Sequence, residues 1–472
     1  IMLRWTLLVA LCSAAVATPL LNIRTDEQSP HFIDSEGRVR FFHGVSSVQK
    51  GPPWYPYWLQ NDTLVDWLAE TGFNFVRLGW MWSGFEPSEG QFNETYFQIT
   101  EEIVENLASR GIYTLLDAHQ DVLSSEFCLY DGFPQWVINK TLPDVKHPFP
   151  WPMHGNCSSR NWMMNILSEA AANAYQELYD NTHGVRDSFA RFWTESAKRW
   201  ANNSNVIGFE LINEPFAGDY FKHPTILLPG EAGKRNLQPL YDVLSDAIRP
   251  IDDSHILFYE PVTWGMLFEG KIVGPGFTQV PGGVDHRNMS ALSYHYYCSS
   301  FGGDRKICDG VLGPSMFKSI REEVGRIGGA SMMTEFGACG DDNLAECEDV
   351  LALTEKNLQS WSDWESLAAG SVPGPAWRLA YARPYPRAIA GQPLNMTFHT
   401  DSRELSLCYT LQSSTMDTEV FVSPVQYNNG VKVHTTSNLK AWTTKKGDIV
   451  NVASAPGAVN GEVGCVIVSP LP

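Results

Sequence analysis

Two glutamates in this chain each stand at the end of an apolar segment that has the character of a buried strand. The first lies in Leu211-Ile-Asn-Glu-Pro215, where the polar pair Asn213-Glu214 ends the apolar run and the proline stops it. The second is Glu335, in Met332-Met-Thr-Glu-Phe-Gly337. Two carboxyl groups on different strands are the pair that glycoside hydrolysis needs, one as acid and then base, the other as nucleophile. The pattern therefore predicts a glycosidase with Glu214 and Glu335 as its catalytic residues.

Other polar and aromatic side chains follow apolar segments in the same way and could bind a sugar. An ammonium group at Lys50 could reach a sugar hydroxyl, and the Arg77 guanidinium could keep a carboxylate ionised through hydrogen bonds. His295 and Tyr297 are two residues apart, so they share one face of a strand. Each also has an ordinary alternative, such as a solvated charge, a core histidine or a side chain that plugs a barrel. The predicted substrate-binding residues are Lys50, Arg77, His119, Asp121, Asn213, His295, Tyr297 and Trp364, with Gln120 beside them.

The elements that must position these residues alternate between short apolar runs and longer helical patterns. In Phe97–Arg110, for example, apolar residues recur four apart and Gly111 follows as a stop. Eight such strand–helix units predict an α/β fold, a (β/α)8 TIM barrel over residues 18–372, with its site at the C-terminal ends of the strands. A doubly wound open sheet is the alternative, but no glycine-rich nucleotide loop follows the first strand. The expected strands are Val39–Val48, Asn74–Trp82, Tyr113–Ala118, Val206–Ile212, Ile256–Pro261, Leu292–Tyr297, Ser331–Phe336 and Leu358–Glu365.

Two long segments interrupt this alternation, and the pattern changes near the C-terminus. Residues 122–165 and 216–237 fall where barrel enzymes build their substrate-binding loops. After about Pro373 the helical periodicity stops, and short alternating stretches are separated by turns such as Asn428-Asn429-Gly430. These stretches predict a small antiparallel β-sandwich domain over residues 373–472.

Composition and charge exclude several classes of protein. Of the 472 residues, 43% are hydrophobic and 18% are charged, which excludes a disordered chain, a coiled coil and a collagen-like fibre. The balance of 34 basic and 53 acidic residues gives a net charge of −19. Such a chain does not favour a nucleic-acid partner, and an anionic membrane repels it on average. Only transient contact with membranes or micelles is expected.

The N-terminus and the glycosylation signals indicate a secreted protein. Arg4, the apolar run from Trp5 to Val16 and the small residues ending at Ala17 predict a cleaved signal peptide at residues 1–17. An uncleaved anchor is the alternative. The expected location is extracellular, or the lumen of a digestive or lysosomal compartment. Sequons for N-glycosylation stand at Asn61, Asn93, Asn139, Asn156, Asn202, Asn288 and Asn395.

Cysteine usage agrees with an oxidising compartment. Removal of Cys12 with the signal peptide leaves an even number of cysteines, which suggests four disulfides. Proximity along the chain favours Cys298–Cys308 and Cys339–Cys347, and then Cys128–Cys157 and Cys408–Cys465, although the connectivity stays open. No close Cys/His spacing typical of zinc occurs, so no metal is expected.

The candidate residues resemble, in type and order, those of family 5 of the glycoside hydrolases, and more closely those of the endoglycoceramidases. The resemblance covers essentially the whole chain after residue 17. It implies a retaining enzyme that releases the intact oligosaccharide from ceramide, with Glu214 as acid/base, Glu335 as nucleophile and Asn213 on the 2-hydroxyl of the reacting glucose. No cofactor and a monomer are expected. The motifs that carry it are Arg77, His119, Asn213-Glu214-Pro215, His295-x-Tyr297, Glu335, Trp364, Asp117-Ala-His-Gln-Asp121, Thr334-Glu-Phe-Gly and Arg383-Pro-Tyr-Pro-Arg-Ala-Ile-Ala-Gly391.

The segments near Glu214 are unusually apolar, which independently favours a lipid aglycone and hence a glycosphingolipid substrate. Exposed apolar patches on a secreted protein usually indicate a ligand or partner. The alternative is that these residues pack the insertion onto the barrel. Hydrolysis of glucosylceramide, steryl glucoside, β-glucan or mannan, or glycolipid binding without catalysis, also stay open. The apolar residues are Trp136, Phe149, Trp151, Trp162, Met163, Met164, Phe216, Phe221, Ile226, Leu227 and Leu228.

Overall fold

The computed structural model describes residues 19–472 except 27–28, 129–131, 263–274 and 299–302, and its centre is a closed barrel of parallel strands. Each of the eight expected strand segments overlaps one barrel strand, which confirms the predicted fold class. The predicted signal peptide at residues 1–17 lies outside the described residues. In order, the barrel strands are β4 (His43–Ser47), β5 (Phe75–Gly79), β6 (Tyr113–Asp117), β7 (Val206–Glu210), β8 (Ile256–Tyr259), β9 (Ser290–Tyr296), β10 (Ala330–Gly337) and β11 (Ser360–Trp364).

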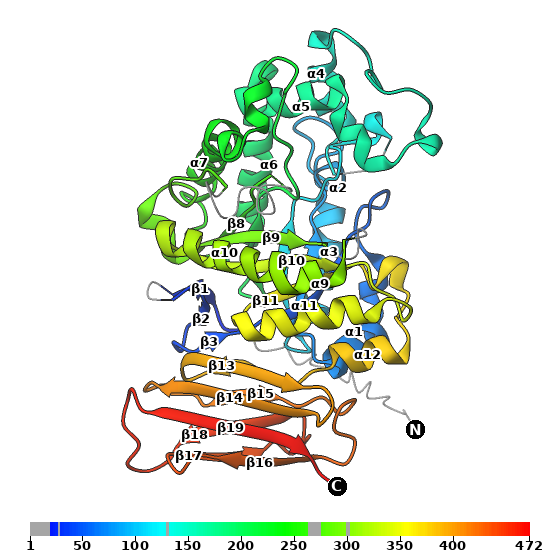
Figure 1. Ribbon diagram of the computed structural model, residues 1–472. Helices are drawn as coiled ribbons and strands as arrows, with labels where there is room; N and C mark the ends of the chain where they lie inside the picture. Colours follow the sequence, from blue (N-terminus) through cyan, green and yellow to red (C-terminus); the bar gives the residue numbers. More distant parts are fainter. Residues whose placement is uncertain (1–18, 27–28, 129–131, 263–274, 299–302) are drawn as a thin grey trace, which may run out of the picture.

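The barrel strands are almost entirely buried because helices cover their outer side, as Figure 1 shows. One apolar cluster includes Phe42, Phe75 and Met332, and hydroxyl pairs such as Ser293–Thr334, 3.1 Å apart, connect neighbouring strands. The larger cluster includes core residues of both the strands and the surrounding helices. The main helices are α1 (Asp62–Thr71), α3 (Glu94–Ala108), α5 (Glu169–Asp180), α6 (Val185–Trp200), α7 (Gln238–Ile248), α10 (Gly313–Ile327), α11 (Leu344–Asn357) and α12 (Pro375–Tyr381).

Local sequence signals set the ends of these helices. Asn61 caps α1 by accepting a hydrogen bond from the Thr63 N–H, and Asn93 caps α3 through the Tyr96 N–H. Gly72 ends α1 with a φ of +117°, a backbone conformation that few other residues adopt. The strands that follow these helices thus begin at fixed points, which places their polar C-terminal residues at one end of the barrel.

The insertion at residues 122–165 folds into short helical pieces above the barrel (Figure 1). Its helix α4 (Gln135–Thr141) runs into the single turn η3 (Leu142–Asp144), and the turns η2 (Ser125–Phe127), η4 (Cys157–Ser159) and η5 (Trp162–Leu167) complete it. The Cys128–Cys157 disulfide ties η2 to η4. The structure also contains the other three expected pairs, Cys298–Cys308, Cys339–Cys347 and Cys408–Cys465.

The C-terminal region is a pair of antiparallel sheets with its own apolar core, as expected. Strand β14 alternates regularly between buried and partly exposed residues, as a strand with one face on a core should. The four-stranded sheet has the order β13 (Gly391–His399), β14 (Glu404–Leu411), β19 (Val463–Pro470) and β16 (Val431–Thr435). The seven-stranded sheet has the order β1 (Ile23–Thr25), β2 (Phe32–Asp34), β3 (Val39–Arg40), β12 (Tyr385–Ile389), β15 (Thr418–Phe421), β18 (Ile449–Ser454) and β17 (Leu439–Thr443).

The seven-stranded sheet joins both ends of the chain. Strand β3 pairs with β12 through Val39 and Ile389, and Figure 1 shows β1–β3 between the barrel and the C-terminal strands. Arg38 strengthens this junction, because its guanidinium contacts both Asp34 and Glu419. A division of the chain at residue 373 therefore separates strands that share one sheet. No helix among the described residues has the length and hydrophobicity needed to cross a membrane.

Candidate active site

The predicted catalytic and substrate-binding residues converge at the C-terminal end of the barrel. Arg77, His295, Glu335 and Trp364 belong to strands β5, β9, β10 and β11. Lys50, His119, Asp121, Asn213, Glu214 and Tyr297 lie in the loops that follow β4, β6, β7 and β9. Hydrogen bonds, ion pairs and ring contacts connect them into two neighbouring groups, one around the glutamates and one around Trp364.

Glu335 is buried and hydrogen-bonded on both oxygens. Arg77 Nη1 donates to its Oε1 at 2.6 Å, and the Tyr297 hydroxyl donates to its Oε2 at 2.7 Å. Charge-assisted hydrogen bonds of this kind stabilise the ionised form of a carboxyl group and fix its orientation. Glu335 is therefore held as an oriented carboxylate, which is the state that a nucleophile requires.

Arg77 is completely buried and orders the centre of the site rather than its surface. Besides Glu335, it donates to Glu210 and, at 2.6 Å, to Asn213 Oδ1, and it lies 3.0 Å from Asp117. Burial alone would lower the pKa of Arg77, but the surrounding carboxylates raise it well above its usual value. A permanent cation thus balances the negative charges beneath the two glutamates.

Glu214 lies opposite Glu335 and is partly open to solvent, with 19% of its side chain exposed. Its Oε1 is 2.7 Å from His295 Nδ1, and its backbone has a φ of +39°, uncommon for a residue with a side chain. Carboxylate oxygens of Glu214 and Glu335 come within 4.8 Å of each other. Such a short separation suits a nucleophile and an acid/base. The gap leaves no space for a water molecule between the substrate and the second carboxylate, so that carboxylate attacks the substrate directly.

Glu260 is a member of the site that the sequence reasoning did not single out. It directly follows β8, accepts a hydrogen bond from the Glu214 main-chain N–H and lies 2.7 Å from His295 Nε2. The pKa of Glu260 is raised to about 7, mainly by burial and also by Glu210 and Glu214, while His295 opposes the shift. The signal was present, because Glu260-Pro261 ends an apolar strand just as Glu214-Pro215 does.

His295 therefore stands between three carboxylates. Its Nδ1 faces Glu214 and lies 3.4 Å from Glu335, and its Nε2 faces Glu260. Burial would lower the pKa of His295, but these carboxylates raise it well above its usual value. The ring is thus suited to orient Glu214 by hydrogen bonding.

Gln120 occupies a different position from the one expected. Sequence reasoning placed it among the sugar-binding residues, but it is completely buried. Its amide nitrogen donates to the main-chain oxygens of Asn213 and Glu214, and its oxygen accepts from the Leu123 N–H at 2.9 Å and the Tyr175 hydroxyl. Gln120 supports the catalytic loop because every polar atom of its side chain faces protein.

A second group forms around Trp364. Its ring stacks on His119 with centroids 5.1 Å apart, and Lys50 Nζ lies 4.6 Å from its centroid. Lys50 also forms an ion pair with Asp121. Burial would lower the pKa of His119, yet Asp117 and Asp121 raise it to about 10. A flat aromatic ring with charged hydrogen-bonding groups beside it is a typical sugar-binding arrangement.

Glu365 is a further acid near this group that the sequence reasoning missed. Its pKa is raised to about 7, mainly by burial and also by Glu335 and Asp121, whereas Lys50 and His119 oppose the shift.

Glu214, His295 and Glu335 could also be considered as metal ligands, since their ligand atoms come within 4.8 Å of one another. All three already bond to each other or to Arg77 and Tyr297. A metal ion would have to displace these hydrogen bonds, so the arrangement fits proton transfer and nucleophilic attack better than metal binding.

The apolar residues near Glu214 divide into two sets. Phe216 and Ile226 are buried in the barrel core, and Trp136 and Phe149 pack against it, as the structural alternative expected. Trp151 and Phe221 instead pack against each other, with ring centroids 5.3 Å apart, and remain partly exposed. The other exposed members are Trp162, Met163, Met164, Leu227 and Leu228.

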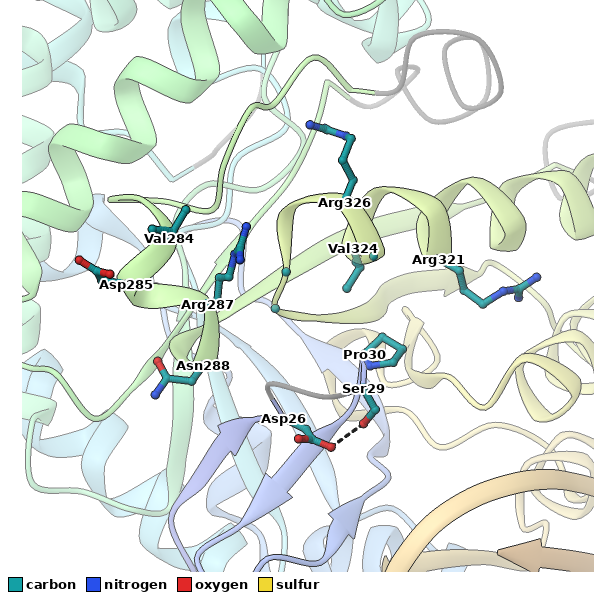
Figure 2. A pocket seen from close by; sticks show the side chains of 13 residues that line it. Asp26, Ser29, Pro30, Val284, Asp285, Arg287, Asn288, Arg321, Val324 and Arg326 are labelled. Atoms are coloured by element: carbon teal, nitrogen blue, oxygen red, sulfur yellow. Dashed lines mark hydrogen bonds between the residues drawn. The ribbon is translucent and has the colours of Figure 1, made fainter. Parts of the chain in front are cut away.

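A cavity of about 660 Å³ lies at the opposite end of the barrel, where β9 and β10 begin. Figure 2 shows three arginines on its wall. Arg287 donates to the Ile327 oxygen at 2.8 Å, Arg326 pairs with Glu323 and Arg321 bonds Asn357. Because these groups bind the protein itself, the cavity is no competitor to the carboxylate site.

Comparison with known proteins agrees with this geometry. Residues 33–370 match the family described as "Cellulase (glycosyl hydrolase family 5)", and residues 383–467 match the "Glycoside hydrolase family 5 C-terminal domain". The chain is 36% identical to an endoglycoceramidase of Hydra vulgaris, over 89% of this chain and 84% of the relative. It is 34% identical to an endoglycoceramidase of Cyanea nozakii, over 88% of this chain and 87% of the relative. Endo-glycoceramidase II from Rhodococcus sp., solved as a ganglioside GM3 complex, has the same fold (TM-score 0.77, 21% identity, 94% of this chain and 100% of that one).

Proposed function

The chain belongs to glycosyl hydrolase family 5, and we propose that it is an endoglycoceramidase that works with retention of configuration. In this proposal it cleaves the β-glucosidic bond between the oligosaccharide and the ceramide of glycosphingolipids. The observation that carries the proposal is the approach of Glu214 and Glu335 to within 4.8 Å. Retaining enzymes have their carboxyl groups about 5–5.5 Å apart, whereas inverting enzymes need a wider gap for water.

Glu335 is the proposed nucleophile, because Arg77 and Tyr297 hold it as an oriented carboxylate. It attacks the anomeric carbon of the glucose and forms a glycosyl–enzyme ester, while the bond to the ceramide oxygen breaks. Glu214 donates its proton to that oxygen as ceramide leaves. It then removes a proton from water, which attacks the same carbon and releases the sugar with its original β configuration.

The remaining residues bind and orient the substrate. One N–H of the Asn213 side-chain amide donates to the main-chain oxygen of Gln120 at 2.8 Å, and the second N–H of the same amide is proposed to contact the glucose 2-hydroxyl. Trp364 supplies a ring for stacking, and His119, Asp121 and Lys50 offer hydrogen bonds to the other hydroxyls.

The lipid part of the proposal is supported by the exposed apolar residues of the insertion and of the loop after β7. Trp151 and Phe221 are proposed to contact the ceramide chains, and they allow transient contact with a membrane or micelle surface. A β-glucan hydrolase is the second candidate, since the matched family is described as a cellulase. Exposed methionine and leucine side chains favour the lipid over a polysaccharide.

Secretion is part of the same proposal. It is supported by the four disulfides and by the sequons, together with the apolar N-terminal segment. We also propose that the enzyme acts as a monomer, without a cofactor.

The test is to identify the products from a panel of glycolipids and glucans. The enzyme is expected to release intact oligosaccharide and ceramide from gangliosides and lactosylceramide, as read by mass spectrometry. Glu335→Gln, prepared in the same way, is the control for contaminating activity. If the enzyme released cello-oligosaccharides from a soluble β-glucan and gave no product from any glycolipid, the second candidate would replace the proposal.

A further inference from the structure

A group of three side chains at the base of the insertion has no part in the proposed reaction. Asp144 ends turn η3, Glu177 belongs to α5, and His183 lies in the turn η6 (Thr182–Gly184) that follows α5. Their potential ligand atoms all lie within 4.8 Å of one another. His183 Nε2 is 3.0 Å from Asp144 Oδ2, so two of the three already meet.

Glu177 is the residue that points to a ligand. It is only 4% exposed, and its Oε1 accepts a hydrogen bond from Asn173 Nδ2 at 2.8 Å. Its Oε2 is buried and has no hydrogen-bond partner within the described part of the chain. A buried carboxylate oxygen without a partner is costly, so its retention beside Asp144 and His183 calls for a partner that binds there.

Neighbouring residues hold Glu177 in this orientation. Asn173 also donates to the Thr141 oxygen at 3.2 Å, while its own Oδ1 accepts from Lys222 Nζ at 2.9 Å. These contacts fix which end of the amide faces Glu177. The charge of Lys222 is balanced by Asp219, 3.0 Å away. Outer residues that orient a ligand in this way are typical of metal sites.

We propose that Asp144, Glu177 and His183 bind a Zn²⁺ ion that fastens the insertion to helix α5. One imidazole nitrogen and two carboxylate oxygens, completed by water, suit tetrahedral zinc. Calcium and magnesium prefer six or more oxygen ligands, which this group does not offer. Two carboxylates also neutralise a divalent ion. Asp144 and His183 are half exposed, which gives the ion access from solvent.

The site would have a structural effect because its ligands come from separate elements. Asp144 comes from turn η3, which directly follows helix α4 of the insertion, whereas Glu177 and His183 come from α5 and the turn after it. These elements pack together. An ion shared between them would oppose separation of the insertion from the barrel. The proposal is independent of the substrate, so it stands or falls separately from the proposed function.

The experiment measures zinc binding by the full-length protein after removal of metal with a chelator. Titration calorimetry with ZnCl₂ is expected to show one ion bound at this site, and the melting temperature is expected to rise with zinc. Changes in residues around a metal's ligands typically weaken binding roughly tenfold to 100-fold. Glu177→Gln and His183→Gln, which alter ligands themselves, should weaken it at least as much and remove the melting shift.

Two control variants separate this site from other histidine–carboxylate groups. His147→Gln changes a histidine of the same insertion whose Nδ1 lies 2.6 Å from Glu169, and Glu335→Gln alters the catalytic carboxylates. Both should keep the wild-type zinc response at the insertion. His183 is exposed, so His183→Gln should fold normally even if Glu177→Gln does not. Absence of zinc binding in the wild type, or an unchanged zinc response in His183→Gln, would overturn the proposal.

Discussion

The carboxylates of Glu214 and Glu335 face each other with oxygens within 4.8 Å, although the two residues are far apart in the sequence. Arg77 and Tyr297 hold one of them, and His295 holds the other. The two acids therefore have different surroundings and different proposed roles.

The two roles give different products when azide replaces the missing group. Glu335→Ala is expected to lose turnover, and azide should restore it by attacking the anomeric carbon directly, giving the α-glycosyl azide. Glu214→Ala should instead form the β-glycosyl azide, because its glycosyl–enzyme intermediate still forms. Proton NMR of the products distinguishes the anomers. The opposite assignment of anomers would exchange the roles of the two glutamates.

Glu214→Ala should also be sensitive to the leaving group. General acid catalysis contributes roughly 10²- to 10⁴-fold to rate, so cleavage of glycosphingolipid should fall by about that factor. A dinitrophenyl glycoside needs little protonation and should be cleaved at nearly the wild-type rate in its first step. Pre-steady-state release of the phenol measures this step. A loss of equal size on both substrates would argue against Glu214 as the acid.

Arg77→Met is expected to destabilise the whole fold. The variant leaves Glu210, Asp117 and Glu335 as buried charges without their cation, and removal of one partner from such a group costs about 3–5 kcal/mol. Urea unfolding measures the loss. Lower pH should reduce it, because protonation removes the uncompensated charges. Arg110→Met, which alters a partly exposed arginine paired with the exposed Asp62 and Asp66, is the control and should change stability little.

Glu260 should make stability depend on pH. Its pKa is raised in the folded protein to about 7 by burial, so the native state binds more protons than the unfolded chain between about pH 4.5 and pH 7. Its contribution therefore destabilises the fold as pH rises through this window. Glu260→Gln should flatten the decline of the melting temperature over that range, whereas a change at the exposed Glu126 should not. If the melting temperatures of wild type and Glu260→Gln fell in parallel with pH, Glu260 would not titrate in this pH range.

The aglycone surface should affect lipid substrates selectively. Apolar burial is worth roughly 25 cal/mol per Å², so Trp151→Ala should raise KM for a glycosphingolipid by roughly tenfold. An aryl glycoside, which lacks the two chains, should be little affected. Trp442→Ala removes an exposed aromatic from the C-terminal domain and serves as the matched control. Equal losses on lipid and aryl substrates in folded Trp151→Ala would show that Trp151 does not bind the lipid chains. The lipid assignment would then rest only on the similarity to endoglycoceramidases.

Local sequence was enough to find the barrel strands and the two glutamates. A parallel strand buried on both sides must be a run of apolar residues, and the polar residue that ends it must lie at the rim. Val206–Ile212 comes close to both conditions, because it is apolar apart from Gly208 and the buried Glu210 and is followed at once by Asn213-Glu214. The disulfide pairs could be favoured for a similar reason, since Cys339 and Cys347 are close along the chain.

Only the tertiary structure decided which polar residues face the substrate and which support it. Gln120 and Asp121 are neighbours in the sequence, yet Gln120 binds buried main chain and Asp121 pairs with Lys50. The pairing of Val39 with Ile389 and the meeting of Asp144 with Glu177 and His183 likewise depend on distant elements. Such contacts form because folding brings distant elements together, and no local periodicity along the chain carries that information.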